Sequence, residues 1–285
     1  MLSMSIAGPA LACNFDDEYA SQPDVREDDN TQSGENSLLG VWTHSASVED
    51  GAGTWTFEMS RPLNTGDEQD AVFTPGESSL MNLAYWDPDR PDGGTDGWDD
   101  DYHVVSAMDG WLQVNWGTET GGGSDQVTTT TEEPEIGSTI DAPGGVSITV
   151  DGDPADWADI AGLDMTLTPI TGEPAEPREA TVKVAHDDTT AYLLFQVQDD
   201  LNWNPENTKR SGAAAIEWQI GPDAPEHMGA EDDARDTSLG MVDIWHWELE
   251  CGSGVESGGA VNPAGDGKDP GNDSVCNFDD EWATD

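Results

Sequence analysis

The stretch Thr54-Trp55-Thr56-Phe57-Glu58-Met59 alternates polar with apolar residues. Strict alternation places one set of side chains on one face of an extended chain, as in a half-buried β-strand. Residues 146–150 and 181–184 alternate in the same way, and residues 191–197 and 214–220 are richer in apolar side chains. Such apolar runs are typical of more deeply buried strands. The sequence therefore predicts a chain built mainly from β-strands.

Turn-forming pairs such as Asp-Gly and Pro-Gly separate these runs, and no long stretch has the period of an amphipathic helix. Several short strands joined by glycine- and proline-containing turns are typical of a β-sandwich. We therefore predict an all-β fold, an antiparallel sandwich of the immunoglobulin-like or jelly-roll-like kind.

Acidic residues dominate the charged positions, with 60 Asp and Glu against 9 Lys and Arg and a formal net charge of −51. Self-repulsion of this size destabilises a compact chain, but molar salt shortens the Debye length to about 3 Å and screens it. The acidic residues are spread along the chain, so we expect a protein adapted to high salt. The 12 Trp residues argue against general disorder. The lack of a basic patch argues against nucleic acid or an anionic membrane surface as a partner.

One octapeptide occurs twice in the chain. Residues 13–20, Cys-Asn-Phe-Asp-Asp-Glu-Tyr-Ala, return at 276–283 with Trp in place of Tyr as the single difference. Self-similarity of this kind indicates an array of units. We interpret the chain as two half-units: residues 1–117 resemble the second half of a unit, and 138–285 the first half of the next. A flexible Thr/Gly/Glu-rich linker over 118–137 joins them. A permuted single domain is the alternative.

The three cysteines fit the same organisation. Cys251 and Cys276 flank a glycine-rich loop and could form a disulfide in an oxidising compartment. Cys13 is then left over, as a free thiol or with its partner in a missing upstream segment. The residues before Cys13 loosely resemble a lipoprotein cleavage site, but the duplicate at Cys276 cannot be lipidated in that way. No stretch has the apolar length of a membrane-spanning helix.

The segment Met228-Gly229, followed by Val242-Asp243-Ile244-Trp245-His246-Trp247, carries a resemblance to a known family. It is similar to the haem-b-binding gamma subunits of dimethyl-sulfide and ethylbenzene dehydrogenases. That family shows a Met-Gly-Asp stretch and then an apolar-Asp/Asn-apolar-Trp-x-Trp strand. Other pieces resemble family motifs in family order: residues 150–157, 182–188, 192–199, 279–282, 55–67, 73–76, 83–87 and 102–106. The later family motifs precede the earlier ones here, which agrees with the repeat.

The resemblance implies a b-type haem between two axial ligands. Met228, with Gly229 beside it, occupies the place of the family's thioether ligand, which tends to raise the reduction potential. Several relatives use a Lys as the opposite ligand, and His103 stands in that place here. We therefore expect Met/His ligation of the haem iron, with Met241 as an alternative thioether. We expect Trp245 and Trp247 to be core or pocket-wall aromatics that exclude water from the cofactor.

Three other histidines have different expected positions. We expect His246 to face away from the two Trp side chains on its strand, and His44 and His186 to be structural or exposed.

Met228 and His103 belong to one site only if the two half-units close on each other or if neighbouring chains exchange halves. Contacts between copies of the chain are therefore expected.

The expected function is electron transfer outside the cytoplasm or at the cell surface in high salt, without catalysis. The sequence lacks a nucleophile elbow, a phosphate-binding loop, a His-Glu-x-x-His motif and a CxxC motif. The expected partner is a redox protein, such as a molybdenum enzyme or a small copper or haem carrier. The alternatives are a carbohydrate-binding sandwich that uses exposed Trp residues, and a surface or self-assembling repeat without cofactor.

Overall fold

The computed structural model describes residues 15–22, 25–28, 37–46, 51–67, 70–86, 103–106, 110–118, 136–169, 175–201, 203–204, 207–211, 213–220, 224 and 241–248. Its elements are β1 (Phe15–Gln22), β2 (Val25–Asp28), β3 (Leu39–His44), β4 (Ala52–Pro62), β5 (Ser78–Trp86), β6 (His103–Val105), β7 (Trp111–Trp116), β8 (Ile136–Ala142), the 3-10 helix η2 (Pro154–Trp157), β9 (Leu163–Pro169), β10 (Arg178–His186), β11 (Thr190–Asp200), β12 (Trp203–Asn204), β13 (Asn207–Ser211), β14 (Ala213–Gln219) and β15 (Val242–Glu248). No helix in these ranges is both long and apolar enough to span a membrane. The predicted all-β class is confirmed.

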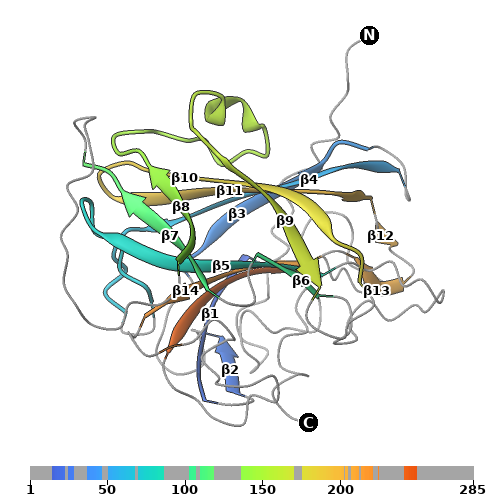
Figure 1. Cartoon of the computed structure of the whole chain (residues 1–285), viewed down its shortest axis with the longest axis horizontal. Helices are drawn as coiled ribbons and strands as arrows, with labels where there is room; N and C mark the ends of the chain where they lie inside the picture. The colour runs from blue at the N-terminus through green and yellow to red at the C-terminus, as the bar shows by residue number, and fades with distance from the viewer. Residues whose placement is uncertain are drawn as a thin grey trace, which may run out of the picture.

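One continuous sheet accounts for nearly all of these strands. Its order is β2-β1-β15-β14-β5-β6-β9-β10-β11-β4-β3, with β7 beside β5 and β8 beside β7. The sheet curls into two layers, with β3, β4, β10 and β11 above β5, β14 and β15 (Figure 1). Neighbouring strands are antiparallel apart from the parallel β7–β8 pair. The antiparallel sandwich predicted from the sequence is therefore confirmed, although its two layers are one folded sheet.

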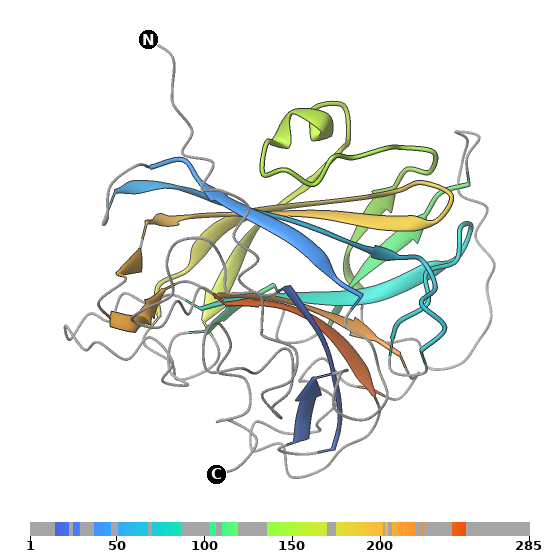
Figure 2. The same ribbon diagram turned by 180° about the vertical axis from the view of Figure 1, so that it is seen from behind.

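The two layers meet through short pairings at one edge. Val104 and Val105 of β6 pair with Pro169 and Thr168 of β9, and this contact carries the sheet from the lower into the upper layer. At the other end, β1 of the lower layer lies close to β3 of the upper layer. The view from behind shows β3 in the upper layer and β1 beside β15 in the lower one (Figure 2). The curled sheet therefore encloses a core between its layers.

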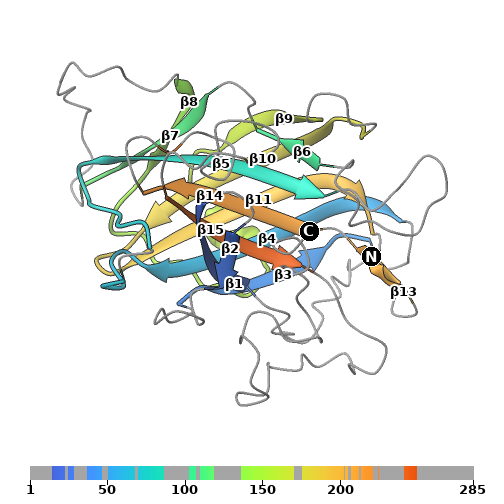
Figure 3. The same cartoon turned by 90° about the horizontal axis from the view of Figure 1, so that it is seen from below.

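Strands from the two predicted half-units pair with each other in both layers. β4 pairs with β11 along its whole length, from Ala52 opposite Asp200 to Pro62 opposite Thr190. β5 pairs with β14, and β7 with β8. Seen from below, β14 and β15 from the second half-unit lie beside β5 and β1 from the first (Figure 3). The described strands of residues 1–117 and of residues 138–285 thus pair with each other. β8 begins at Ile136, inside the range that composition assigns to the linker.

The core between the layers is rich in aromatic residues. Trp55, Phe57 and Met59 alternate along β4 and are fully buried, as residues 54–59 predicted. Phe57 lies opposite Phe195 of β11. Burial of each large apolar side chain stabilises the fold by about 1.5–3 kcal/mol. The remaining fully buried aromatics of this core are Phe73, Tyr85, Trp116, Phe195, Trp218, Trp245 and Trp247.

The outer face of the upper layer is covered by the segment 143–162, which carries η2. Glu58 of β4 points to this side and is fully buried. Its Oε2 accepts hydrogen bonds from the backbone N–H of Asp151 at 2.9 Å and of Gly152 at 2.6 Å, and its Oε1 accepts one from Nε1 of Trp157 at 2.8 Å. β4 is therefore buried on both faces, although its alternation alone predicted a half-buried strand.

The strand predicted over residues 146–150 is wrong. This segment lies across the sheet and forms no strand. Its backbone donates hydrogen bonds from Val146 N to His186 O at 3.0 Å and from Thr149 N to Oδ2 of Asp156 at 3.0 Å. Ile148 is buried against Trp157 and Tyr192 in a second apolar cluster. The alternation in sequence arises because every second side chain packs on the sheet beneath, which requires an extended chain but no ladder of hydrogen bonds.

Candidate functional site

β15 divides its side chains between the two faces of the lower layer. Trp245 and Trp247 are fully buried and point into the core between the layers. The Trp247 ring lies 4.7 Å from the Phe57 ring of the upper layer, measured between centroids. His246, between them in sequence, packs instead against Trp86 on the outer face, with ring centroids 5.5 Å apart. The predicted orientation of His246 away from the two tryptophans is confirmed.

Trp245 belongs to a cluster of rings inside the sandwich. Its ring centroid lies 5.4 Å from that of Trp218 and 5.8 Å from that of Phe73. Within the described ranges, neither Nε1 of Trp245 nor Nε1 of Trp218 has a hydrogen-bond acceptor. A buried donor left without an acceptor costs about 1–3 kcal/mol. These two indole groups can therefore still donate to an acceptor from elsewhere in the chain or from a ligand.

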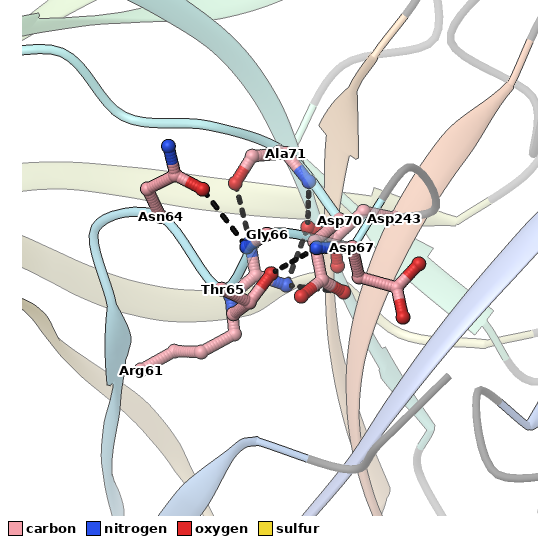
Figure 4. A network of polar contacts seen from close by, with 8 residues as sticks. All are labelled: Arg61, Asn64, Thr65, Gly66, Asp67, Asp70, Ala71 and Asp243. Atoms are coloured by element: carbon pink, nitrogen blue, oxygen red, sulfur yellow. Dashed lines mark hydrogen bonds and ion pairs between the residues drawn. The ribbon is translucent and has the colours of Figure 1, made fainter. Parts of the chain in front are cut away.

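A buried ion cluster connects the two layers beside these rings (Figure 4). Arg61 of β4 lies with Nη1 2.7 Å from Oδ2 of Asp243 on β15 and 3.4 Å from Oδ1 of Asp70. The Arg61 Nη2 group donates to the backbone O of Ala71 at 2.6 Å, and Ala71 N donates to Oδ2 of Asp243 at 2.7 Å. All three charged side chains are almost completely buried. Because removing one partner would leave a buried charge, this cluster holds β4, β15 and the segment around residue 70 together.

Aromatic rings enclose the guanidinium of the cluster. The Arg61 Cζ atom lies 5.1 Å from the ring centroid of Trp245 and 5.4 Å from that of Phe73. A cation over an aromatic face is attracted by the ring quadrupole, more strongly where water is excluded. Trp245, predicted as a cofactor-pocket residue, therefore has an observed contact with the buried cation.

The segment that brings Asp70 into the cluster is shaped by two local hydrogen bonds, also drawn in Figure 4. Gly66 N donates to Oδ1 of Asn64 at 2.9 Å, and Asp67 N donates to Oγ1 of Thr65 at 3.2 Å. Asn and Thr side chains stabilise turns by this contact to the backbone two residues further on. Gly66 has a φ of +85°, a conformation that glycine adopts without strain.

The predicted haem ligand His103 begins β6, and its backbone position is described. His103 lies opposite Trp86 in the antiparallel β5–β6 pair, while its neighbour Val104 is fully buried in the core. Directly opposite residues of a pair share one face of a sheet. Position 103 is therefore on the outer face of the lower layer, together with Trp86 and His246.

The structure thus separates the predicted site residues into two groups. Trp245 and Trp247 face the core between the layers, whereas position 103 belongs to the opposite face of the same sheet. Met228 and Gly229 lie outside the described residues, so their meeting with His103 stays a prediction. The alternative thioether, Met241, directly precedes β15 and is half-buried. Its backbone O accepts a hydrogen bond from Ile220 N at 3.0 Å.

Small and apolar residues surround the outer-face position. Ala213 of β14 lies opposite Trp86, and Ala215 lies opposite His246. Both alanines are buried, and they cluster with Trp86 and Ile244. This face therefore combines buried small apolar side chains with an aromatic ring and two histidine positions.

His44 has a structural role. Its Nε2 lies 3.1 Å from the backbone O of Asp199, and its Nδ1 accepts a hydrogen bond from Ala46 N at 3.0 Å. The ring is therefore a neutral Nε2–H tautomer, which donates at one nitrogen and accepts at the other. Burial lowers the pKa of His44 below its usual value, and this stabilises the same neutral form.

His186 is also buried and lies where β7 and β10 end. Its Nε2 is 2.8 Å from the backbone O of Gly117, and its Nδ1 is 2.8 Å from that of Asp187. The contact to Gly117 ties the first half-unit to the second. The expectation that His44 and His186 are structural rather than ligands agrees with these contacts.

The pairing of Arg61 with Asp243 was not predicted from the sequence. Each is a charged residue in a strand that contains several large apolar side chains. A charged side chain in a buried strand requires a partner of opposite charge, so this pattern was the available signal. It could not name the partner, because 60 acidic residues compete for nine basic ones.

The predicted disulfide depends on cysteines that the structure does not describe. All three cysteines, Cys13, Cys251 and Cys276, lie outside the described residues, so the disulfide stays a prediction.

A carbohydrate site would present exposed Trp rings. Of the tryptophans whose side chains the structure describes, Trp42 is half-buried and the others are buried: Trp55, Trp86, Trp111, Trp116, Trp157, Trp218, Trp245 and Trp247.

In the described part of the chain, no group of three or more His, Cys, Asp or Glu side chains is arranged to hold a bare metal ion. Comparison of the chain with protein-family models, with curated proteins and with solved structures finds no match.

Proposed function

We propose that the protein is an extracytoplasmic b-type haem-binding module for electron transfer, with Met228 and His103 as the axial ligands. The observation that carries the proposal is the closure of the two half-units. β6, which bears His103, and β15, which bears the Trp-x-Trp motif, belong to one sheet with only β5 and β14 between them. The family-like motifs around residues 103 and 245 therefore lie in the same sheet, separated by two strands.

The chemistry of the outer face of the lower layer suits a porphyrin. Position 103, which pairs with Trp86 in the sheet, carries a histidine, and imidazole is a good iron ligand. Ala213, Ala215 and Ile244 are buried apolar residues that cluster with Trp86. A haem bound there would supply one-electron redox chemistry. Met228 would provide the second ligand, and thioether ligation favours the reduced state.

On this proposal, Trp245 and Trp247 act from the far side of the sheet. They fill the core behind β15 and anchor Arg61 through the Trp245 ring. Their contribution is to keep the ligand-bearing strands rigid rather than to wall the pocket directly. The protein would pass electrons to a redox partner, such as a molybdenum enzyme or a small copper or haem carrier. High external salt would screen its charge of −51.

The proposal is tested by purifying the full chain in high salt with added haem and recording oxidised and reduced visible spectra. We expect a Soret band, with sharp α and β bands on reduction. His103→Ala and Met228→Leu should each remove the low-spin bands. Met241→Leu and His44→Asn are the matched controls and should leave the spectrum unchanged.

Three outcomes would contradict the ligand assignment or the function. If Met241→Leu abolishes the bands and Met228→Leu does not, the thioether is assigned wrongly. If neither histidine variant changes the spectrum, His103 is not a ligand. If the folded protein binds no haem, electron transfer through haem is excluded. A colourless protein that forms assemblies would then favour the self-assembling repeat, which the duplicated octapeptide supports independently.

A further inference from the structure

Asn82 is a buried amide on the outer face of the lower layer. Its neighbours in β5, Met81 and Leu83, belong to the core between the layers. Because successive side chains of a strand point to opposite faces, Asn82 points to the outer face, as Trp86 does four residues later. Asn82 is only 5% exposed. This face therefore carries a polar side chain in a place that solvent hardly reaches.

Ser106 determines which end of the Asn82 amide points towards it. Ser106 Oγ accepts a hydrogen bond from Leu83 N at 3.0 Å and donates one to Oδ1 of Asn82 at 3.1 Å. A hydroxyl group has one proton to donate, and here that proton goes to the amide oxygen. In the reversed amide orientation, the Ser106 oxygen would accept twice and its proton would lose this acceptor. The amide nitrogen, Nδ2, is therefore the end that Ser106 does not bind.

The amide nitrogen of Asn82 is left with an unused hydrogen-bonding capacity. Within the described part of the chain, Nδ2 has no hydrogen-bond partner. Nearly all buried polar side-chain atoms in proteins have one, so an exception calls for a physical explanation. Because an amide nitrogen only donates, the group that completes this site is an acceptor.

The unpaired amide lies on the face that the proposed function assigns to the haem. Trp86 lies opposite His103 in the sheet, and Asn82 is on the same face of β5. At about 3.3 Å per residue, positions 82 and 86 are about 13 Å apart. Ala84 stands between them on this face and lies opposite Ala215 of β14. The expected axial ligand and the amide therefore occupy two separate points of one face, with small side chains between them.

We propose that Asn82 donates an amide hydrogen to a carboxylate of the bound porphyrin, so that it anchors a haem propionate. This inference rests on the proposed haem-binding function and assigns a second contact to that site. An ionised carboxylate only accepts hydrogen bonds, as Nδ2 of Asn82 requires. With a net charge of −51, the protein repels an anionic ligand group. A buried amide donor offsets this repulsion at one point without a Lys or Arg.

Glu217 adds a second expectation to the proposal. It lies directly opposite Asn82 in the β5–β14 pair and is half-buried. Directly opposite residues share one face of a sheet, so a ligand carboxylate at Asn82 lies near the Glu217 carboxylate. Like charges repel more strongly where water is scarce. Removing the charge of Glu217 should therefore strengthen binding of a ligand with free carboxylates.

The test compares haem with haem dimethyl ester, in which both propionates are blocked, by Soret titration of the full chain in high salt. Asn82→Leu removes the donor at similar volume. Asn82→Asp keeps an acceptor for the Ser106 hydroxyl and replaces the donor with a carboxylate. Asn115→Leu removes an amide on β7 that donates to Asp141, and it is the matched control. Denaturant unfolding of each variant shows that it is folded.

We expect Asn82→Leu to weaken haem binding about tenfold to hundredfold and Asn82→Asp to weaken it further. Both variants should change binding of the dimethyl ester much less, because the ester carries no charge. Glu217→Gln should strengthen binding of haem but not of the ester, and Asn115→Leu should change neither.

Two results would overturn the inference, and they differ in what they say about the function. If wild type binds haem and the Asn82 variants bind it equally well, or lose haem and ester alike, Asn82 does not anchor a propionate and the haem function stands. If the folded wild type binds neither haem nor its ester, the proposed function fails and this inference fails with it.

Discussion

Arg61 and Asp243 come from opposite layers of the sandwich and form a fully buried ion pair at 2.7 Å. They are 182 positions apart in the chain, on β4 and β15. Because Arg61 also donates to Ala71 O and Asp243 accepts from Ala71 N, the pair holds a connecting segment as well as two strands. This arrangement makes the pair a sensitive test of the closed fold.

We predict that Arg61→Leu destabilises the protein by about 3–5 kcal/mol, because Asp243 and Asp70 lose their buried cation. Denaturant unfolding in high salt measures the change. The double variant Arg61→Leu/Asp243→Asn should recover part of the loss, since one uncompensated charge is removed. Arg61→Lys keeps the charge but not the planar fork, so it should be intermediate. A wild-type unfolding midpoint for Arg61→Leu would contradict the closed arrangement.

His44 makes the stability of the protein depend on pH in the weakly acidic range. Burial lowers the pKa of His44 below 6.5 in the folded state, so the unfolded chain binds a proton more readily. The free energy of unfolding should therefore fall as pH falls from above 6.5 towards the folded-state pKa. His44→Asn keeps an acceptor for Ala46 N but cannot be protonated.

The difference between wild type and His44→Asn isolates this effect from the many carboxylates. We expect the difference in unfolding free energy between the two proteins to change across this pH range. A constant difference would show that His44 titrates alike in the folded and unfolded states.

The Tyr192 hydroxyl donates to Oδ2 of Asp187 at 2.7 Å. Burial and this hydrogen bond raise the pKa of Tyr192 from 10.0 to about 12. Stability from this group should be fully present below pH 10 and should be lost as pH rises towards 12. Ultraviolet titration of tyrosinate should show one late-titrating tyrosine, and Asp187→Asn should lower its pKa. An unchanged titration curve in that variant would contradict the assignment to this hydrogen bond.

Gly152 occupies a position that other residues cannot take without strain. Its φ is +80°, and a Cβ there would lie 2.5 Å from Cγ2 of Thr43. We predict that Gly152→Ala destabilises the protein by about 2–4 kcal/mol, from the left-handed backbone and the clash together. Gly145→Ala is the matched control, because its φ is +69° and its added Cβ would meet no atom within 4 Å. If the melting temperature falls equally in both variants, the contact between residue 152 and Thr43 is not tight.

Salt should stabilise the protein strongly. Its net charge of −51 is screened over about 10 Å at 0.1 M salt and about 3 Å at 1 M. We therefore expect the melting temperature to rise steeply over this range in KCl. Sucrose at matched water activity serves as the uncharged control and should have a smaller effect. A flat response to KCl would contradict the interpretation of the acidic composition as an adaptation to salt.

Strand content and most strand positions could be predicted from alternation in the sequence, because a two-residue period is a local property of an extended chain. The runs at 54–59, 181–184, 191–197 and 214–220 all lie in β-strands or at their ends. The run at 146–150 shows the limit. Its side chains alternate like those of a strand, but whether the backbone finds a partner depends on neighbouring elements.

β15 shows the same limit at the candidate site: alternation predicts which side chains share a face, but it does not predict which face packs on the core. The sequence alone predicted that His246 and its two tryptophan neighbours point to opposite sides. It could not tell which side is the core, so Trp245 and Trp247 were assigned to the same site as His103. The structure places position 103 on the other face, because β6 follows the register of β5 opposite Trp86.

By itself, the sequence determined the class of structure, the acidic composition and the duplicated octapeptide, since each of these is a property of neighbouring residues or of composition. Only the tertiary structure decided that the two half-units interleave in one curled sheet and that Arg61 finds Asp243. Long-range pairing depends on which buried surfaces and charges complement each other, and in a chain with so many acids no local pattern identifies the partner.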